Sequence, residues 1–306
     1  MDELLKHILL EFQIHNKMLD EKHGRIPQIQ QYIYDLFENA IFPMEQMMKS
    51  NNDTIRAEVF HKDIFPNCDC FFTHCNIDIT LYLDNKSSFR GGYYPKKSFY
   101  SDTTSFVTMK ITVGGKDFND INNSLRSVFA HELTHAYDDY CKTMHYGTIS
   151  SKIDIDARKN NYYNTVNLHG FSHNQDAMCD ILNRLSPLEL KAYIGQFEAE
   201  IKPNVDKIKD AVSAWELAKE TIAWNKLDYL ERSIKTLNSI TDKDYQNHLL
   251  TYYNNIYPLK PLSTYNQLLK TLNGRFYKFK RIFINRISKI LYDLYSENNI
   301  INSNST

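Results

Sequence analysis

Two histidines and one glutamate stand close together in the segment V-F-A-H-E-L-T-H-A-Y-D-D, which covers residues 128–139. His131 and His135 are four residues apart, so on an α-helix they lie on one face, one turn apart. Two imidazoles in that arrangement can bind one Zn²⁺ ion at about 2.0–2.1 Å each. Glu132 lies roughly 100° around the helix from His131 and can reach the open coordination position without being a ligand. The spacing predicts a zinc ion on His131 and His135, with Glu132 as general base beside a zinc-activated water.

The residues around this motif support the prediction because they are uncharged, whereas a surface helix would normally carry charge at some of these positions. They are Val128, Phe129, Ala130, Leu133, Thr134, Ala136 and Tyr137. The alternative is two histidines packed in a helix core beside a surface glutamate, which would bury imidazoles without partners at a cost in free energy. The stretch resembles the active-site helix of the zincin metallopeptidases, in which Val or Thr often stands three residues before the first histidine, as Val128 does here. The resemblance implies a zinc metalloendopeptidase that acts on a protein or peptide substrate.

A catalytic zinc site needs a third protein ligand. In metzincins a histidine follows at a fixed short spacing, but no Gly-x-x-His follows His135, which excludes that form. In gluzincins a glutamate of a later helix completes the site. Glu189, with Ala192 and Tyr193 one turn on, resembles the Glu-x-x-Ala-aromatic arrangement of gluzincin-like families and is the predicted third ligand. The same Glu189 also fits a capping box with Ser186, in which its carboxylate would bond to the serine backbone N–H and be lost to zinc.

Several other side chains are alternatives for the third ligand: Asp176, Asp180, Glu198, Glu200, His169 and His173. A donor to the oxyanion of the tetrahedral intermediate is also needed, and its candidates are His169, His173, Tyr162, Tyr163 and Tyr193. Asp139, one turn beyond His135, either orients an active-site group or belongs to a solvated acidic helix end. Nothing in the residue pattern selects among these alternatives.

The elements before the motif are predicted from a change of hydrophobic period. Apolar and polar residues alternate in segments 54–60, 77–83 and 106–113, which predicts three half-buried strands of one sheet. The pairs Gly91-Gly92 and Gly114-Gly115 are interpreted as turns between strands. In zincins the last strand before the motif helix is often an exposed edge, so the resemblance makes 106–113 the candidate for binding an extended peptide; a plain sheet strand is the alternative. The motif helix is predicted from about Asn122–Ser124 to Tyr140.

Helices are predicted on either side of this region from apolar residues at three- and four-residue steps. They cover residues 2–22, Pro27 to Ile41 with Pro43 ending or kinking the helix, 204–238 as one helix or two, and Gly274 to Tyr295. The stretch between the last two is polar and rich in tyrosine. The side of the last helix opposite its apolar residues is basic. Such a face can bind nucleic acid or an acidic membrane, but more commonly it is only exposed to solvent. Cys68 and Cys70, with His74 and Cys75, have poor spacing for a structural zinc site and are interpreted as buried thiols.

The overall composition is that of a globular chain of 306 residues with 42% hydrophobic residues and a net charge of −1, which points to neither a nucleic acid nor a membrane partner. The predicted fold is α+β and zincin-like, with a small mixed sheet and the active-site helix, followed by a mainly helical C-terminal region. Predicted divisions are an N-terminal helical layer at 1–50, a catalytic domain at 51–200, a helical region at 201–297 and a disordered tail at 298–306.

The first residues do not resemble a signal peptide, no apolar run is long enough to span a membrane, and the five cysteines favour a reducing compartment. A cytoplasmic location is expected, with export by a non-classical route left open. The alternative function is a zincin-like binding or interaction protein that does not hydrolyse peptides.

Overall fold

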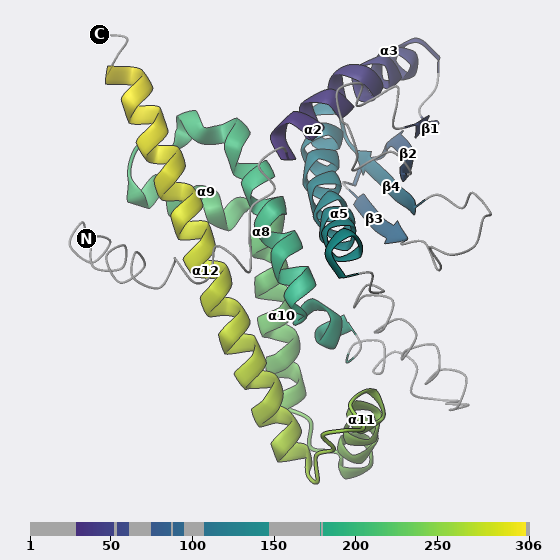
Figure 1. Ribbon diagram of the computed structural model, residues 1–306, viewed down its shortest axis with the longest axis vertical. Coiled ribbons are helices and arrows are strands. Elements are labelled where there is room, and N and C mark those ends of the chain that lie inside the picture. The colour runs from purple at the N-terminus through teal and green to yellow at the C-terminus, as the bar shows by residue number, and fades with distance from the viewer. Residues whose placement is uncertain are drawn as a thin grey trace.

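The computed structural model describes residues 29–51, 54–60, 75–86, 88–94, 107–146, 178 and 180–303 (Figure 1). Over these residues the fold is α+β, with one small sheet and mostly helical content. The expectations for the helix at 2–22 and for Cys68, Cys70 and His74 lie outside the described residues.

The sheet has four strands, β1 (Thr54–Phe60), β2 (Cys75–Leu83), β3 (Ser88–Tyr94) and β4 (Val107–Gly115). Their order is β1-β2-β4-β3, with β2 parallel to β4 and the two outer strands antiparallel to their neighbours. The three alternating segments form β1, β2 and β4 as predicted, and alternate residues of β2 and β4 are buried. The period of two therefore identified the strands that cover a core.

Strand β3 corrects two predictions. Gly91 and Gly92 do not form a turn; they lie inside β3, opposite Ile111 and Lys110 of β4. Strand β4 is not an edge, because it pairs with β2 on one side and β3 on the other. The candidate peptide-binding segment 106–113 thus has no free backbone edge along its described part, residues 107–113. Among the described strands, β3 and β1 are the edges.

The motif lies in helix α5 (Phe118–Tyr146), which starts directly after β4. Its first turn is capped by Asp117, whose side chain accepts a hydrogen bond from the backbone N–H of Asp120 at 2.9 Å. The helix therefore begins before the predicted Asn122–Ser124, because an earlier residue supplies the cap. Its apolar side, including the fully buried Leu125 and Phe129, belongs to one hydrophobic cluster with β2 and β4.

The helix predicted from Pro27 to Ile41 continues further along the chain than expected. Helix α2 (Ile29–Leu36) continues through a π-helical turn, η1 (Phe37–Ile41), into α3 (Phe42–Asn51). Pro43 does not end the helical path, since the wider turn precedes it and places it in the first turn of α3. In Figure 1 this purple layer lies at one end of α5, and its buried residues join the cluster of α5 and the sheet.

The second half of the described chain is helical. It contains α8 (Pro187–Ile201), the 3₁₀ turn η2 (Lys202–Lys207), α9 (Ala211–Glu220), α10 (Ile222–Asn238), α11 (Lys243–Ile256) and α12 (Tyr265–Ser303). The segment predicted as one helix or two forms α9 and α10, separated at Thr221, which caps α10. Helix α11 lies in the polar, tyrosine-rich stretch for which no helix was predicted, and Asp242 provides its cap. Helix α12 extends beyond its predicted limits at both ends.

Part of the basic face predicted for α12 is used inside the protein. Lys280 forms an ion pair with Glu231 at 2.6 Å, and the guanidinium of Arg275 lies over the ring of Tyr257 at 4.7 Å. Arg286 is buried. Among the described residues, no helix is long and apolar enough to cross a membrane.

Buried hydrophobic residues form two clusters. One joins α2, α3, the sheet and α5. The other joins Met178 and residues of the five helices α8, α9, α10, α11 and α12. Helix α8 lies beside α5 (Figure 1) and contributes Ala199 to the first cluster and most of its apolar residues to the second. The motif histidines therefore lie where the two clusters meet.

Candidate metal centre between helices α5 and α8

Helices α5 and α8 run antiparallel, and polar side chains line their contact. Ser127 of α5 meets Glu200 near the end of α8, whereas His135 meets Glu189 near its beginning. Along α8, Glu189, Tyr193, Gln196 and Glu200 recur at three- and four-residue steps and share the face toward α5. Two regular helices thus bring together residues that are far apart in sequence.

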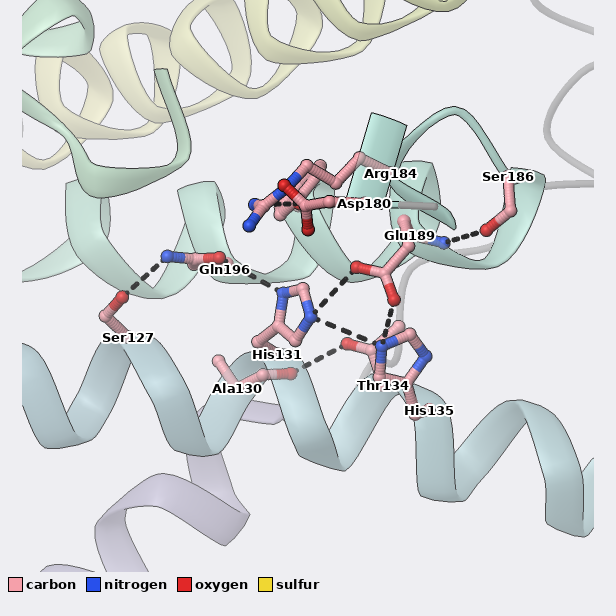
Figure 2. Close-up of polar contacts among 11 residues, drawn as sticks. Ser127, Ala130, His131, Thr134, His135, Asp180, Arg184, Ser186, Glu189 and Gln196 are labelled. Atoms are coloured by element: carbon pink, nitrogen blue, oxygen red, sulfur yellow. Dashed lines mark hydrogen bonds and ion pairs between the residues drawn. The ribbon is translucent and has the colours of Figure 1, made fainter. Parts of the chain in front are cut away.

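Glu189 faces both motif histidines (Figure 2). Its Oε2 lies 3.3 Å from Nε2 of His131, and its Oε1 lies 3.3 Å from Nε2 of His135. The two Nε2 atoms are 3.2 Å apart. Among the described residues, His131, His135 and Glu189 are the group of metal-ligating side chains whose donor atoms converge.

These separations can be compared with those of a zinc site. In a tetrahedron with bonds of about 2.05 Å, neighbouring donor atoms are roughly 3.3 Å apart. The observed distances of 3.2–3.3 Å fit that spacing. Hydrogen bonds between the three side chains explain this triangle less well than a shared metal does. The carboxylate oxygens only accept, and each Nε2 faces both a carboxylate oxygen and the other Nε2, so the three contacts cannot all pair a donor with an acceptor when both imidazoles are neutral. The donor set of two imidazoles and one carboxylate is that of a catalytic zinc site with a fourth position open.

Glu189 is free to face the histidines because it does not close a capping box. The hydroxyl of Ser186 accepts a hydrogen bond from the backbone N–H of Glu189 at 3.2 Å, which caps α8. The reciprocal contact is absent, since the backbone N–H of Ser186 donates to the carbonyl of Asn183 at 2.9 Å. Burial raises the pKa of Glu189, but its contacts with His131 and His135 outweigh that effect and hold it well below 4.5. Glu189 is therefore an ionised carboxylate aimed at the two imidazoles.

A hydrogen-bond network sets the tautomer of His131. The side-chain amide of Gln196 donates through Nε2 to Oγ of Ser127 at 2.7 Å and to Oε1 of Glu200 at 2.9 Å. Its Oε1 must then face Nδ1 of His131, 3.2 Å away, and accept a proton from it. With the proton on Nδ1, the lone pair of Nε2 points toward Glu189 and is available to a metal.

The network ends in Glu200, which is partly buried. Its Oε1 also accepts from Ser127 at 2.6 Å, and its Oε2 accepts from the backbone N–H of Ala223 at 3.3 Å. Burial raises the pKa of Glu200, and the hydrogen bonds from Ser127 and Gln196 only partly oppose this. Glu200 is thus a structural acceptor that connects α5, α8 and the start of α10.

Glu132 lies on the side of α5 that faces β3. Its side chain is 6% exposed, and its Oε2 makes no hydrogen bond to any described residue. A Cβ atom added at Gly91 of β3 would come within 2.8 Å of Oε1 of Glu132 and 2.5 Å of Cγ1 of Val128. A buried carboxylate oxygen without a protein partner is costly unless water or a ligand reaches it. The glycine therefore allows the strand to approach the buried Glu132 carboxylate closely.

The other proposed ligands are placed elsewhere or lie outside the described residues. Asp180 is engaged by Arg184, whose Nε donates to its Oδ2 at 2.7 Å. Glu200 is held by Ser127 and Gln196, and Glu198 lies nine residues beyond Glu189, on the opposite face of α8. Asp176, His169, His173, Tyr162 and Tyr163 fall outside the description, as does the side chain of Asp139.

A pocket of about 540 Å³ opens over the three converging side chains. Residues 89–93 of β3 form one wall, and side chains of α5, α8, α10 and the helical residues 180–184 before α8 form the others. Tyr193 lies on the wall with its ring 5.2 Å from that of His131, and its hydroxyl oxygen accepts from Arg184 at 3.2 Å. Burial raises the pKa of Tyr193, so its phenol stays protonated in the neutral range.

Parts of the site were not predicted from the sequence: Gln196, Ser127, Arg184, Lys226 and the wall formed by β3. Gln196 is seven residues after Glu189, so helical periodicity placed it on the ligand face once Glu189 was considered. No comparable signal marked Lys226 or β3, because both reach the pocket only through tertiary packing.

Comparisons of the chain with protein-family models, with curated proteins and with solved structures found no match in any of the three. The site must therefore be interpreted from its own geometry.

Proposed function

We propose that the chain is a zinc-dependent metallopeptidase of the zincin type, with His131, His135 and Glu189 as zinc ligands and Glu132 as general base. The observation that carries the proposal is the triangle of donor atoms at 3.2–3.3 Å, built by two antiparallel helices. The unpartnered, buried Oε2 of Glu132 in the same pocket supports it independently. A purely structural histidine pair would account for neither feature.

When bound, zinc would supply Lewis acidity, which brings the pKa of a coordinated water toward about 7 and polarises the scissile carbonyl. The protein groups act around it. Glu132 takes a proton from the attacking water and passes it to the leaving amine. Tyr193 donates its phenolic proton in a hydrogen bond to the developing oxyanion, while Arg184 holds the phenol in place. Gln196 keeps His131 in the tautomer that can bind zinc.

Strand β3 is the proposed guide for the substrate. It is an edge among the described strands, it lines the pocket from Phe89 to Tyr93, and it faces Glu132 through Gly91. An extended peptide can add to such an edge through main-chain hydrogen bonds, which would place its carbonyls alongside the catalytic residues. This assignment replaces the segment 106–113 that the sequence suggested.

Metal analysis and a cleavage assay on purified full-length protein test the proposal. We expect about one zinc ion per chain. Glu132→Gln should keep the zinc but lower cleavage of casein or a peptide library by about 10²–10⁴-fold. Glu189→Gln should weaken zinc binding, whereas Glu198→Gln, the same change on the opposite face of α8, should not.

Two results would contradict the proposal in different ways. If the protein takes up no zinc, the metal centre is wrong. If it binds zinc stoichiometrically but cleaves no peptide, or if Glu132→Gln cleaves as fast as wild type, the peptidase mechanism is wrong and the non-hydrolytic binding protein becomes the better explanation.

A further inference from the structure

The pocket beside the metal centre is lined by as many cationic side chains as carboxylates, but two of its cations are not paired with any of these carboxylates. Its ionisable lining, apart from the histidines and tyrosines, comprises Glu132, Asp180, Glu189, Arg90, Arg184 and Lys226. Glu189 faces the histidines, and Asp180 forms an ion pair with Arg184. Arg90 and Lys226 form no ion pair with any described residue. A bound divalent cation would give the pocket a net positive charge.

Lys226 is the better placed of the two cations. It projects from α10 into the pocket, and its Nζ lies 5.3 Å from the centroid of the Phe89 ring of β3. The ammonium therefore reaches across to the strand that we propose as the substrate guide. The side chain is half-buried, and this burial, together with the guanidinium of Arg184, lowers the pKa of Lys226, while the carboxylates of Asp180 and Glu189 partly oppose the effect. An incoming anion would offset both effects.

A peptide bound along β3 would lie beside Phe89 and Lys226, which line the same pocket as Glu132. A carboxylate on that peptide can take the ammonium as a charge-assisted hydrogen-bond partner, while an amide of the same shape gains much less. The stem of Lys226 and the Phe89 ring also give this subsite apolar walls, which reduce solvent screening of the charge pair.

We infer that Lys226, helped by Arg90, forms a subsite for a substrate carboxylate next to the metal centre, so that the preferred substrates are acidic peptides. This inference rests on the proposed function for the presence of a peptide, but the subsite itself is defined by charge and geometry. The carboxylate comes either from an Asp or Glu side chain or from a free peptide C-terminus.

Binding of fluorescein-labelled peptide pools measures this preference without needing cleavage. The pools share degenerate flanks and carry either Glu or Gln at one central position, and each is made with a free C-terminal carboxylate and with a C-terminal amide. Fluorescence anisotropy is recorded with the full-length Glu132→Gln protein, with and without added zinc. Lys226→Gln, Lys226→Arg and Arg90→Gln are introduced into it. Lys235→Gln is the matched control, since Lys235 is on the same helix but 70% exposed and paired with Glu231.

We expect at least one carboxylate-bearing pool to bind about tenfold more tightly than its neutral counterpart. Preference for the Glu pool among the amidated peptides identifies a side-chain subsite, and preference for free acid over amide identifies a C-terminal one. Lys226→Gln should abolish the preference and Lys226→Arg should retain it. Arg90→Gln should reduce it, and Lys235→Gln should leave it unchanged. Circular dichroism checks that each variant is folded.

Equal binding of all four pools, or a preference that survives Lys226→Gln in folded protein, would overturn the inference. The proposed function fails separately. If wild-type protein cleaves nothing but the Lys226-dependent preference is present, the carboxylate subsite stands and the peptidase assignment does not. If the protein cleaves peptides but shows no such preference, the peptidase assignment stands and the carboxylate subsite does not.

Discussion

The substitution Gly91→Ala tests whether the approach of β3 to α5 positions the general base. The new Cβ would lie 2.5 Å from Cγ1 of Val128 and 2.8 and 2.9 Å from Oε1 and Cγ of Glu132. Ordinary contact begins near 3.4 Å, so the Glu132 carboxylate would have to shift by about 0.6 Å. The clash involves the stem of Glu132 as well as its tip, so a rotation of the carboxylate alone does not relieve it.

Two effects of different size follow from this displacement. Overpacking of this kind costs about 1–3 kcal/mol of unfolding free energy, which lowers Tm by a few degrees. Misplacing a catalytic group by about 1 Å can cost roughly 10²-fold in rate, so a smaller shift should lower kcat by about tenfold. The zinc content should not change, because the three atoms nearest to the new Cβ belong to Val128 and Glu132 and not to His131, His135 or Glu189.

Differential scanning calorimetry, zinc analysis and kcat on a quenched peptide substrate separate these effects. Gly274→Ala is the control, because its added Cβ meets nothing within 4 Å in α12 and should be neutral or slightly stabilising. A Gly91→Ala protein with wild-type kcat and wild-type Tm would refute the close approach on which the reasoning depends. A loss of zinc would show that the strand supports the metal ligands instead.

Three further predictions concern the network around His131. Gln196→Leu should weaken zinc affinity about 10–100-fold, measured by competition with a fluorescent chelator, because His131 loses the acceptor that fixes its tautomer; unchanged affinity would argue against that role. Tyr193→Phe should lower kcat by about 10²-fold with little change in KM or zinc content, as expected for an oxyanion donor; an effect confined to KM would contradict it. Glu200, whose folded-state pKa is raised above 4.5 by burial, binds its proton more tightly in the folded protein than in the unfolded chain. Its contribution to stability is therefore greatest below pH 4.5 and falls as pH rises through the raised pKa. Over that pH range the Tm of wild type should fall relative to the Tm of Glu200→Gln.

Glu198→Gln serves as the common control for these variants, since it changes a polar side chain of α8 on the face away from α5. It should leave zinc affinity and kcat close to wild type. The slope of its Tm with pH should also match that of wild type, which separates the effect of burying Glu200 from a general effect of charge on α8.

The local elements were largely predictable because their signals are local. The period of two in segments 54–60, 77–83 and 106–113 reflects a sheet with one buried face, and the four-residue spacing of His131 and His135 needs only a helix. Strand β3 was missed because a glycine pair usually indicates a turn. Here Gly91 lies inside a strand because the strand packs closely against α5 and leaves no space for a Cβ atom. The residues of the strand itself give no sign of that contact.

The sequence by itself determined the two histidines, the neighbouring Glu132 and a short set of possible third ligands. It did not decide between a capping box and a metal ligand for Glu189, because both uses depend on where one flexible carboxylate points. The tertiary structure shows that the capping box is not closed: α8 packs antiparallel to α5, the Ser186 N–H donates to the carbonyl of Asn183, and the Glu189 carboxylate faces the imidazoles. The packing of the two helices likewise selected Gln196 as the partner of His131, 65 residues away. Helix periodicity fixes which side chains share a face, but only the packing of two such faces fixes which side chains meet.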